Sequence, residues 1–507
     1  MTAGLPIDAF VLLAGGLLLA AVLTAALAAR PDRRFRVPGA LLFLGIGMVV
    51  GSDVLGVVNV DDARLVRDVG VVALLVILFE GGLTTKPTDL RLAAIPGIAL
   101  STVGVLITAG VTATGAWLLL DVDVTTAALL GAVVASTDAA AVFSMMRTTP
   151  LPRRLSAVLR IESGANDPIA VMLTIGLIAT VEHGALGLGA WAWFAAVQLA
   201  GGATIGAIVG LAGVWLLRRV ELGIVSLYPV LAASIGAVAY GLAAVVGASG
   251  FVAVYLAGVL IGGFVPRHRR SILGFHEAMA NASEVGLFLL LGLLVFPSRL
   301  PAVAFAGIAI CGVLIVVARP VAVWVCTLGS RVGWREQAVI NVAGLRGAVP
   351  IVLATFPYTA GIAEGSLIFD VVFFVVLASV LLQGSALLPL VKRLGLEAPR
   401  AAWAPVAEAL PLDGIDIDLV ELFVDDQLEI AGRRLRDLPP LEDALVAAIV
   451  RDHRVLIAKG DTLIEPGDVL LITTQRQGDA IARLTAWARG EDAGDWVERL
   501  RDPRPER

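Results

Sequence analysis

The chain has 507 residues, of which 58% are hydrophobic and only 16% are charged, and its mean hydropathy is +0.90. This composition excludes an ordinary soluble globular protein, because such proteins carry many more charged residues. The formal net charge of −5 indicates no particular partner, since the charges are unevenly placed, and we expect no nucleic-acid partner.

Apolar runs of about 20 residues, separated by short charged loops, predict a polytopic helical membrane protein. Sixteen Lys and Arg residues lie in six alternate loops, and only two lie in the other six. The positive-inside rule then places the N-terminus outside and the C-terminus in the cytoplasm of a multi-pass protein of the cell inner (plasma) membrane. We expect thirteen spans, at 8–29, 37–58, 67–83, 92–120, 124–146, 155–181, 191–217, 225–247, 251–264, 275–297, 301–327, 337–357 and 368–391.

The fifth and twelfth expected spans are interrupted by polar residues, glycine and proline. Their mid-depth residues are Ser136, Thr137 and Asp138 in the fifth span, and Gly344, Arg346, Gly347 and Pro350 in the twelfth. The two spans are seven apart, and an odd offset means that they cross the membrane in opposite directions. Interrupted helices at corresponding places of inverted halves indicate the midplane site of a transporter. Half-helix ends carry opposed partial charges, which Asp138 and Arg346 could compensate.

The sixth expected span, 155–181, is apolar on both sides of a polar middle that contains Glu162, Ser163, Asn166 and Asp167. A carboxylate at bilayer depth costs ~2.5–3.5 kcal/mol on insertion scales, so two of them in one span need a reason. Ser163 and Asp167 are four residues apart and share one helix face, and the following proline removes a backbone donor. This cluster of oxygens suits a desolvated monovalent cation and a proton that compete for one site.

Further charged residues lie in other expected spans. Glu80 is near the inner end of the third span, where an interfacial carboxylate and a role in the site are both open. Glu284 in the tenth span is expected in a structural ion pair or vestibule rather than as a ligand. Arg160 and Arg319 are expected to end helices or to pair with carboxylates.

Motifs for nucleotide hydrolysis and for transition metals are missing from the sequence. There is no G-x-x-x-x-G-K-[ST] loop, so ATP is not expected to drive the protein directly. The four histidines are scattered, and no His/Cys cluster suits a transition metal. We therefore expect no enzyme activity, no cofactor and no metal beyond a transported alkali cation.

The composition changes after the last span. Residues 1–393 are expected to form the transmembrane domain, and the Pro- and Ala-rich residues 394–414 a linker. Residues 415–488 alternate as several short strands with a final helix, which predicts a small cytoplasmic α+β domain. The charged residues 489–507 are expected to form a tail.

Four motifs together resemble the cation/proton antiporters of the CPA1 branch. They are F-E-G-G-L in the third span, S-T-D-A-A-A-V-F in the fifth, I-E-S-G-A-N-D-P-I-A-V in the sixth and G-L-R-G-A-V-P in the twelfth. Within this branch the chain is most similar to bacterial NhaP-type exchangers that carry a C-terminal TrkA-C domain. The resemblance implies an NhaA/NhaP-like fold of thirteen helices with inverted repeats and two broken crossing helices, followed by a TrkA-C-like domain.

The resemblance also implies roles for matching residues in the ion site. Asp167 would bind either the cation or the proton. Ser163, Thr137 and, through water, Glu80 would complete the shell. Asn166 stands where electrogenic relatives have a second aspartate, which implies electroneutral one-for-one exchange.

Two further roles follow from the same resemblance. Glu162 would pair with Arg346, which would tie the sixth span to the broken twelfth, and Asp138 would serve the helix crossover. The implied function is secondary-active exchange of K⁺ or Na⁺ for H⁺ by a homodimer in the bilayer. A cytosolic nucleotide or cyclic dinucleotide would regulate it through the C-terminal domain, unless that domain only stabilises the dimer.

Two other classes of function are alternatives to antiport. A ligand-gated cation channel would need a repeated selectivity filter, and no T-V-G-Y-G-like segment occurs. An intramembrane aspartyl protease could use Asp138 and Asp167, but it would need a G-x-G-D pattern, which is also missing. Cation/proton antiport is therefore the favoured hypothesis, with the gated channel as the alternative.

Overall fold

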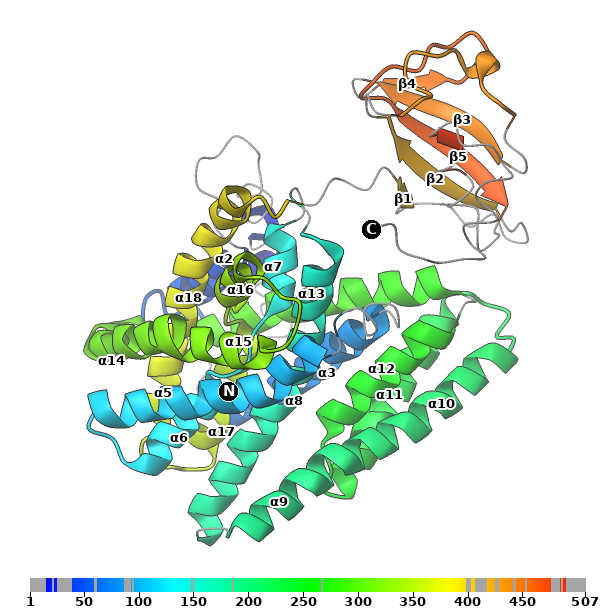
Figure 1. Cartoon of the computed structure of the whole chain (residues 1–507). Coiled ribbons are helices and arrows are strands. Elements are labelled where there is room, and N and C mark those ends of the chain that lie inside the picture. The colour runs from blue at the N-terminus through cyan, green and yellow to red at the C-terminus, as the bar shows by residue number, and fades with distance from the viewer. Residues whose placement is uncertain are drawn as a thin grey trace. The chain divides into compact units, whose positions relative to one another are not determined.

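The computed structural model divides the chain into two compact units, Met1–Ala398 and Pro399–Arg507 (Figure 1). The expected tail, most of the first expected span, much of the linker and most of the expected helix at 476–488 lie outside the described residues. The structure describes residues 15–20, 22–24, 39–58, 62–85, 93, 95–146, 149, 151–184, 187–265, 268–397, 403–405, 417–424, 428–440, 444–451, 454–475, 484, 487 and 488.

The first unit is built of helices, several of which contain a π-helical turn (η1, η2 and η4) or follow a 3₁₀ turn (η3). In chain order they are α2 (Gly39–Val50), α3 (Ala63–Thr84), η1 (Leu100–Gly104), α5 (Val105–Leu119), α6 (Val124–Val133), α7 (Ala139–Met145), α8 (Arg153–His183), α9 (Leu188–Ala196), η2 (Val197–Gly201), α10 (Gly202–Arg219), α11 (Leu227–Val245), α12 (Gly250–Phe264), α13 (Arg269–Leu294), η3 (Pro297–Arg299), α14 (Leu300–Gly312), η4 (Val313–Ala318), α15 (Arg319–Thr327), α16 (Trp334–Ala343), α17 (Ala348–Thr359) and α18 (Gly365–Leu394).

Among the described residues, seven helices are long and apolar enough to cross a membrane, and the bent pair α16 and α17 makes an eighth. Shorter apolar helices occur at Gly15–Thr24, Gly39–Val50, Val124–Val133 and Gly250–Phe264. The expectation of a polytopic helical membrane protein is therefore confirmed. The count of thirteen spans stays a prediction.

Both expected interruptions are present in the structure. The fifth span divides into α6 and α7, and the twelfth divides into α16 and α17, which are bent by 51°. In Figure 1, α6 and α17 lie toward one end of the unit and α7 and α16 toward the other, so the two broken segments run in opposite directions. The backbone N–H of Asp138 donates to the Leu345 carbonyl at 2.8 Å, so the two breaks touch each other.

Close helix packing in this unit depends on glycine, as at the crossing of α3 with α12. A Cβ at Gly82 would overlap the Tyr255 carbonyl, and a Cβ at Gly258 would meet the Phe79 carbonyl. Small residues let membrane helices approach closely enough for backbone contact and dispersion to hold them together. These two helices therefore form one tight layer, which packs against α8.

The second unit contains a five-stranded antiparallel sheet with strand order β1-β2-β5-β3-β4. Its strands are β1 (Trp403–Pro405), β2 (Ile417–Phe423), β3 (Ala444–Arg451), β4 (Arg454–Ile457) and β5 (Val469–Gln475). Alternate apolar residues such as Ile449, Leu470 and Ile472 are buried in its core. The strands expected between 415 and 474 are therefore present.

Within the segment expected as a linker, 394–414, the structure describes one short strand. Trp403–Pro405 forms the edge strand β1, whose Ala404 lies opposite Glu421 of β2. Proline is tolerated there because an edge strand can leave one face of its backbone unpaired. The Pro- and Ala-rich composition of the segment hid this short strand.

Candidate functional site

Helix α8 carries the polar cluster of the sixth span as one continuous helix with Pro168 inside it. Because proline lacks an N–H group, the carbonyl of Gly164, four residues earlier, loses its intrahelical donor. Glu162, Asn166 and Asp167 are buried, with 2%, 1% and 6% of their surface exposed. The polar middle of α8 therefore faces protein rather than lipid.

Thr137, in the break between α6 and α7, is the residue on which this cluster converges. Ser163 Oγ donates to the Thr137 carbonyl at 3.0 Å, and Asn166 Nδ2 donates to the same carbonyl at 3.3 Å and to Thr137 Oγ1 at 2.6 Å. Thr137 Oγ1 in turn donates to Glu162 Oε1 at 3.4 Å. The structure therefore brings Ser163, Asn166 and Thr137 together, as the site hypothesis requires.

Asp167 lies one turn beyond Ser163 on the same helix. Its Oδ1 is buried and has no hydrogen-bond partner among the described residues. Asp138, in the break of the fifth span, is close enough to interact electrostatically with the Asp167 carboxylate. A buried carboxylate oxygen without a partner is rare in folded proteins and calls for an ion, a proton or a water to complete it.

The predicted ion pair between Glu162 and Arg346 is wrong in this structure. Glu162 Oε1 instead lies 2.5 Å from Nη1 of Arg319, and both side chains are almost fully buried. Arg319 begins α15 directly after the π-helical turn η4, and its Nη2 also donates to the Ile340 carbonyl at 3.1 Å. Of the two roles expected for Arg319, pairing with a carboxylate is the one that the structure shows.

Arg346 is occupied elsewhere for a physical reason. Its Nη1 donates to the carbonyls of Ala135 and Ser136, at 2.7 and 2.5 Å. These carbonyls follow the C-terminal end of α6, where a helix leaves acceptors without intrahelical donors and carries a partial negative charge. The Arg346 guanidinium of the twelfth span therefore compensates the partial negative charge at the C-terminal end of α6, in the fifth span.

Asp138 lies where the two broken segments cross. Its Oδ1 accepts from the Ala141 N–H at 3.4 Å, in the first turn of α7. A Cβ at Gly347 would overlap the Asp138 carboxylate, so only glycine fits opposite it. This geometry suits the predicted role of Asp138 at the helix crossover.

Glu80 and Glu284 lie near the cluster but outside its hydrogen bonds. Glu284 of α13 is close enough to interact electrostatically with both Asp138 and Glu80. Within the described part of the chain, no hydrogen bond joins Glu80 to Thr137, Ser163 or Asp167. Its place in the ion shell through water therefore stays a prediction.

One neighbour of the site, Tyr255 of α12, could not be recognised from the sequence. A Cβ at Gly164 would lie 2.7 Å from the Tyr255 hydroxyl, which is itself 3.3 Å from Oγ1 of Thr85, the residue that follows α3. An aromatic residue in an apolar span looks like an ordinary core residue in the sequence, so only the structure shows that Tyr255 packs on α8.

The fold, with two broken helices crossing at buried acids, is that of a secondary transporter for ions. A family model described as "Sodium/hydrogen exchanger, transmembrane" matches residues 14–393, and a TrkA-C domain model matches residues 419–486. The chain therefore belongs to the sodium/hydrogen exchanger family of cation/proton antiporters, and within its CPA1 branch it is NhaP-like with a C-terminal TrkA-C domain.

Individual relatives agree with this assignment. The chain is 35% identical to the K(+)/H(+) antiporter NhaP2 of Shewanella oneidensis over 93% of its own length and 83% of that protein. It is 35% identical to the K(+)/H(+) antiporter NhaP of Alkalimonas amylolytica, with 87% and 77% covered. The solved structure of the sodium proton antiporter MjNhaP1 from Methanocaldococcus jannaschii shares the fold, with a TM-score of 0.66 at 21% identity, over 76% of this chain and 100% of that one.

Proposed function

We propose that the protein is a secondary-active antiporter that exchanges K⁺ for H⁺ across the cell membrane, one for one. The proposal takes its reaction class from the family and its preference for K⁺ from the names of the relatives that match nearly the whole chain. It takes its mechanism from the residues around Asp167. A relative named as a Na(+)/H(+) antiporter, from Halobacillus dabanensis, is 29% identical over 59% of the chain, so Na⁺ is the competing substrate.

The observation that carries the proposal is the buried Asp167 oxygen that has no partner among the described residues. A charged carboxylate inside a membrane protein is costly even with the Ser136 hydroxyl beside it, and either a proton or an alkali cation neutralises it. Because both occupy the same oxygen, binding of one excludes the other. Exchange then requires only that the loaded site opens to each side of the membrane in turn.

Ser163 and Thr137 are proposed to supply the remaining oxygens of the cation shell. Ser163 Oγ and the Thr137 carbonyl are 3.0 Å apart, so both can face one ion once the serine hydroxyl turns its proton away. Oxygen donors of this kind suit hard cations. Glu80 is proposed to contribute through water, from the side of α3.

Asn166 is proposed to set the stoichiometry. It donates to Thr137 and carries no charge, so the exchanging group is a single carboxylate. Glu162 with Arg319 adds no net charge to the site. One K⁺ leaving for each H⁺ entering then moves no net charge, and a membrane voltage should leave the exchange rate unchanged.

The direct test uses the full chain in phospholipid vesicles, with a pH-sensitive dye and with K⁺, Na⁺, Li⁺ and Rb⁺ supplied in turn. Asp167→Asn should abolish exchange with every cation. Asp123→Asn, at the N-cap of α6, should retain it, because asparagine caps a helix as well as aspartate does.

Exchange that persists in the Asp167→Asn protein would contradict the proposed site. Faster exchange with Na⁺ than with K⁺ would contradict the proposed substrate. Cation flux without proton movement would favour the ligand-gated channel instead, and a rate that follows an imposed voltage would contradict one-for-one exchange.

The C-terminal domain is proposed to regulate transport in a homodimer by binding a cytosolic nucleotide or cyclic dinucleotide. Support comes from the TrkA-C match over residues 419–486. Exchange that is unchanged by any nucleotide, in a protein that still elutes as a dimer, would leave the domain with a role in assembly only.

A further inference from the structure

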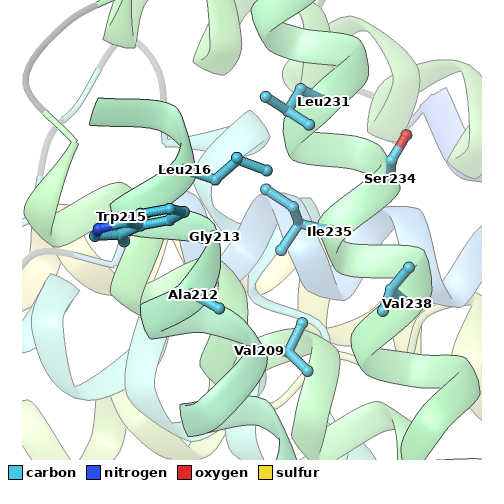
Figure 2. A pocket seen from close by; sticks show the side chains of 9 residues that line it. All are labelled: Val209, Ala212, Gly213, Trp215, Leu216, Leu231, Ser234, Ile235 and Val238. Atoms are coloured by element: carbon cyan, nitrogen blue, oxygen red, sulfur yellow. The ribbon is translucent and has the colours of Figure 1, made fainter. Parts of the chain in front are cut away.

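A groove with a volume of about 390 Å³ opens between α10 and α11 (Figure 2). Small-molecule sites span ~300–1,000 Å³, so the groove is large enough for a ligand. Apart from the indole N–H of Trp215, Ser234 carries the one polar group among the nine side chains that line it, and its Oγ already donates to the Val230 carbonyl at 2.9 Å. The groove therefore offers water almost nothing to bind, and an apolar occupant fits it.

The position of the groove along its helices places it in one leaflet of the bilayer. Both helices belong to segments long and apolar enough to span a membrane, Gly189–Arg219 and Leu227–Val245. The lining residues come from the second half of the segment Gly189–Arg219 and, apart from Val238, from the first half of α11, on either side of the connection 220–226. The groove therefore ends at the membrane surface where the two arginines of the last turn of α10 lie.

One of these arginines is coupled to the groove itself. The Arg219 guanidinium lies 5.6 Å from the ring centroid of Trp215, which lines the groove and is 58% exposed. Arg218 is committed elsewhere, since its Nε and Nη2 donate to the Phe264 carbonyl. Tryptophan and arginine together are typical of helix ends at the level of lipid headgroups. Glu221, two residues after Arg219, is exposed.

We propose that this groove binds an anionic phospholipid, with one acyl chain between α10 and α11 and its phosphate at Arg219. The groove offers charge complementarity along one line: a cation at the membrane surface, a tryptophan beneath it, and then an apolar channel. A phospholipid has this order of groups, an anion followed by a hydrocarbon chain. A helix from a second copy would fill the apolar part but brings no anion to Arg219.

The test uses the purified full-length protein and native mass spectrometry with added phosphatidylglycerol or phosphatidylcholine. Wild-type protein should retain phosphatidylglycerol in preference to phosphatidylcholine. Arg219→Ala should lower its affinity about fivefold, as ~1 kcal/mol per basic residue near an anionic surface implies. Ala212→Leu should lower retention of both lipids, because Ala212 is an exposed lining residue and the larger side chain fills the groove.

A matched control exists in the same chain. The Arg335 guanidinium lies 5.5 Å from the ring centroid of Trp334 at the start of α16, so it has the same stacking without this groove. Arg335→Ala should leave lipid retention unchanged. A second measurement is the quenching of Trp215 fluorescence by brominated phosphatidylglycerol. The Trp215 signal is the difference between the wild-type protein and Trp215→Phe. This quenching should be lost in Ala212→Leu.

Three results would overturn the proposal. Equal retention of phosphatidylglycerol and phosphatidylcholine would show that the charge of the headgroup does not contribute to binding. Equal losses in Arg219→Ala and Arg335→Ala would show only a general effect of surface charge. A loss of dimer mass in Ala212→Leu, with lipid retention unchanged, would assign the groove to a second copy of the chain.

Discussion

Three buried charged residues hold the crossing of the broken helices: Glu162, Arg319 and Arg346, each with no more than 3% of its surface exposed. Two buried positive charges with only one carboxylate between them would be costly in a membrane protein, because one arginine would be left without a partner. The structure avoids this because Arg346 binds the carbonyls of Ala135 and Ser136, while Arg319 takes the carboxylate. Each arginine therefore has its own partner.

This division of partners predicts the outcome of a double-mutant cycle. Arg319→Gln alone should lower the free energy of unfolding by ~3–5 kcal/mol, because it leaves the Glu162 carboxylate buried and unpaired. Adding Glu162→Gln should recover part of this loss, since no unpaired charge remains. Thermal unfolding of the detergent-solubilised protein would measure both effects.

Arg346→Gln combined with Glu162→Gln provides the comparison. Little recovery is expected there, because Arg346 binds carbonyls rather than the carboxylate. If stability recovers strongly in the double variant at Arg346 and Glu162 but not in the one at Arg319 and Glu162, the ion pair is Glu162–Arg346, as predicted from the sequence.

At the scale of helices, α8, which carries the proposed ion site, meets the α3–α12 layer at Gly164 and Tyr255. A Cβ at Gly164 would lie 2.6 Å from Cε2 of the Tyr255 ring and 2.7 Å from its hydroxyl, distances that real Cβ atoms do not reach. Gly164 is one residue from Ser163 and three from Asp167. Any movement of α8 along α12 that opens the site must therefore slide past this contact.

We expect Gly164→Ala to slow exchange severalfold by wedging α8 away from α12, and Tyr255→Ala in the same protein to restore it in part. The measurement is the maximal exchange rate in vesicles, separated from the apparent affinity for K⁺. Gly110→Ala is the control, because a Cβ at Gly110 meets no atom within 4 Å. Equal slowing in the single and the double variant would show that the clash with Tyr255 is not the cause.

Both helix breaks could be predicted from the sequence, because Ser136–Thr137–Asp138 and Gly344–Arg346–Gly347 are polar or helix-breaking residues inside apolar runs. The convergence of α8 on Thr137 followed from family motifs. The Glu162–Arg319 pair did not, since 157 residues separate the partners and nothing in the sequence says which arginine reaches the carboxylate. Tyr255 and β1 were missed because packing against a distant segment decides their role.

At the scale of the whole molecule, the second unit has its own buried charged residue, Asp468, which is 1% exposed. Its two carboxylate oxygens accept from Arg451 Nε and Nη2 at 2.8 Å, and Oδ2 also accepts from the Glu465 N–H at 2.8 Å. Burial alone would raise the pKa of Asp468, but the hydrogen bonds from Arg451 and from the Glu465 amide outweigh it and hold the pKa below its usual value.

This lowered pKa has a defined effect on stability. The ionised carboxylate stabilises the folded domain at neutral pH, and the contribution is lost as the pH falls below the usual aspartate value of ~3.9 and through the lower folded value. Asp468→Asn should therefore destabilise the sheet by ~1–3 kcal/mol at neutral pH and remove this part of its acid sensitivity. Hydrogen exchange of the β3 and β5 amides in the full chain, corrected for the intrinsic rate, would measure it.

The matched control is Asp461→Asn. Asp461 pairs with Arg436 at 2.5 Å, but its side chain is 73% exposed. Exposed pairs contribute ~0–1 kcal/mol, so this change should have little effect at any pH. A larger effect at Asp461 than at Asp468 would contradict the account of the domain.

The central claim is that Asp167 holds either a proton or an alkali cation and never both. The most direct measurement is the number of protons released when K⁺ is added to the detergent-solubilised protein in weakly buffered solution near the pH at which the site is half protonated. About half a proton should be released per K⁺ bound, because half of the sites carry a proton before K⁺ is added and binding and proton release are linked at one carboxylate. None should be released in Asp167→Asn. Binding of K⁺ at that pH without proton release from the wild-type protein would contradict the account.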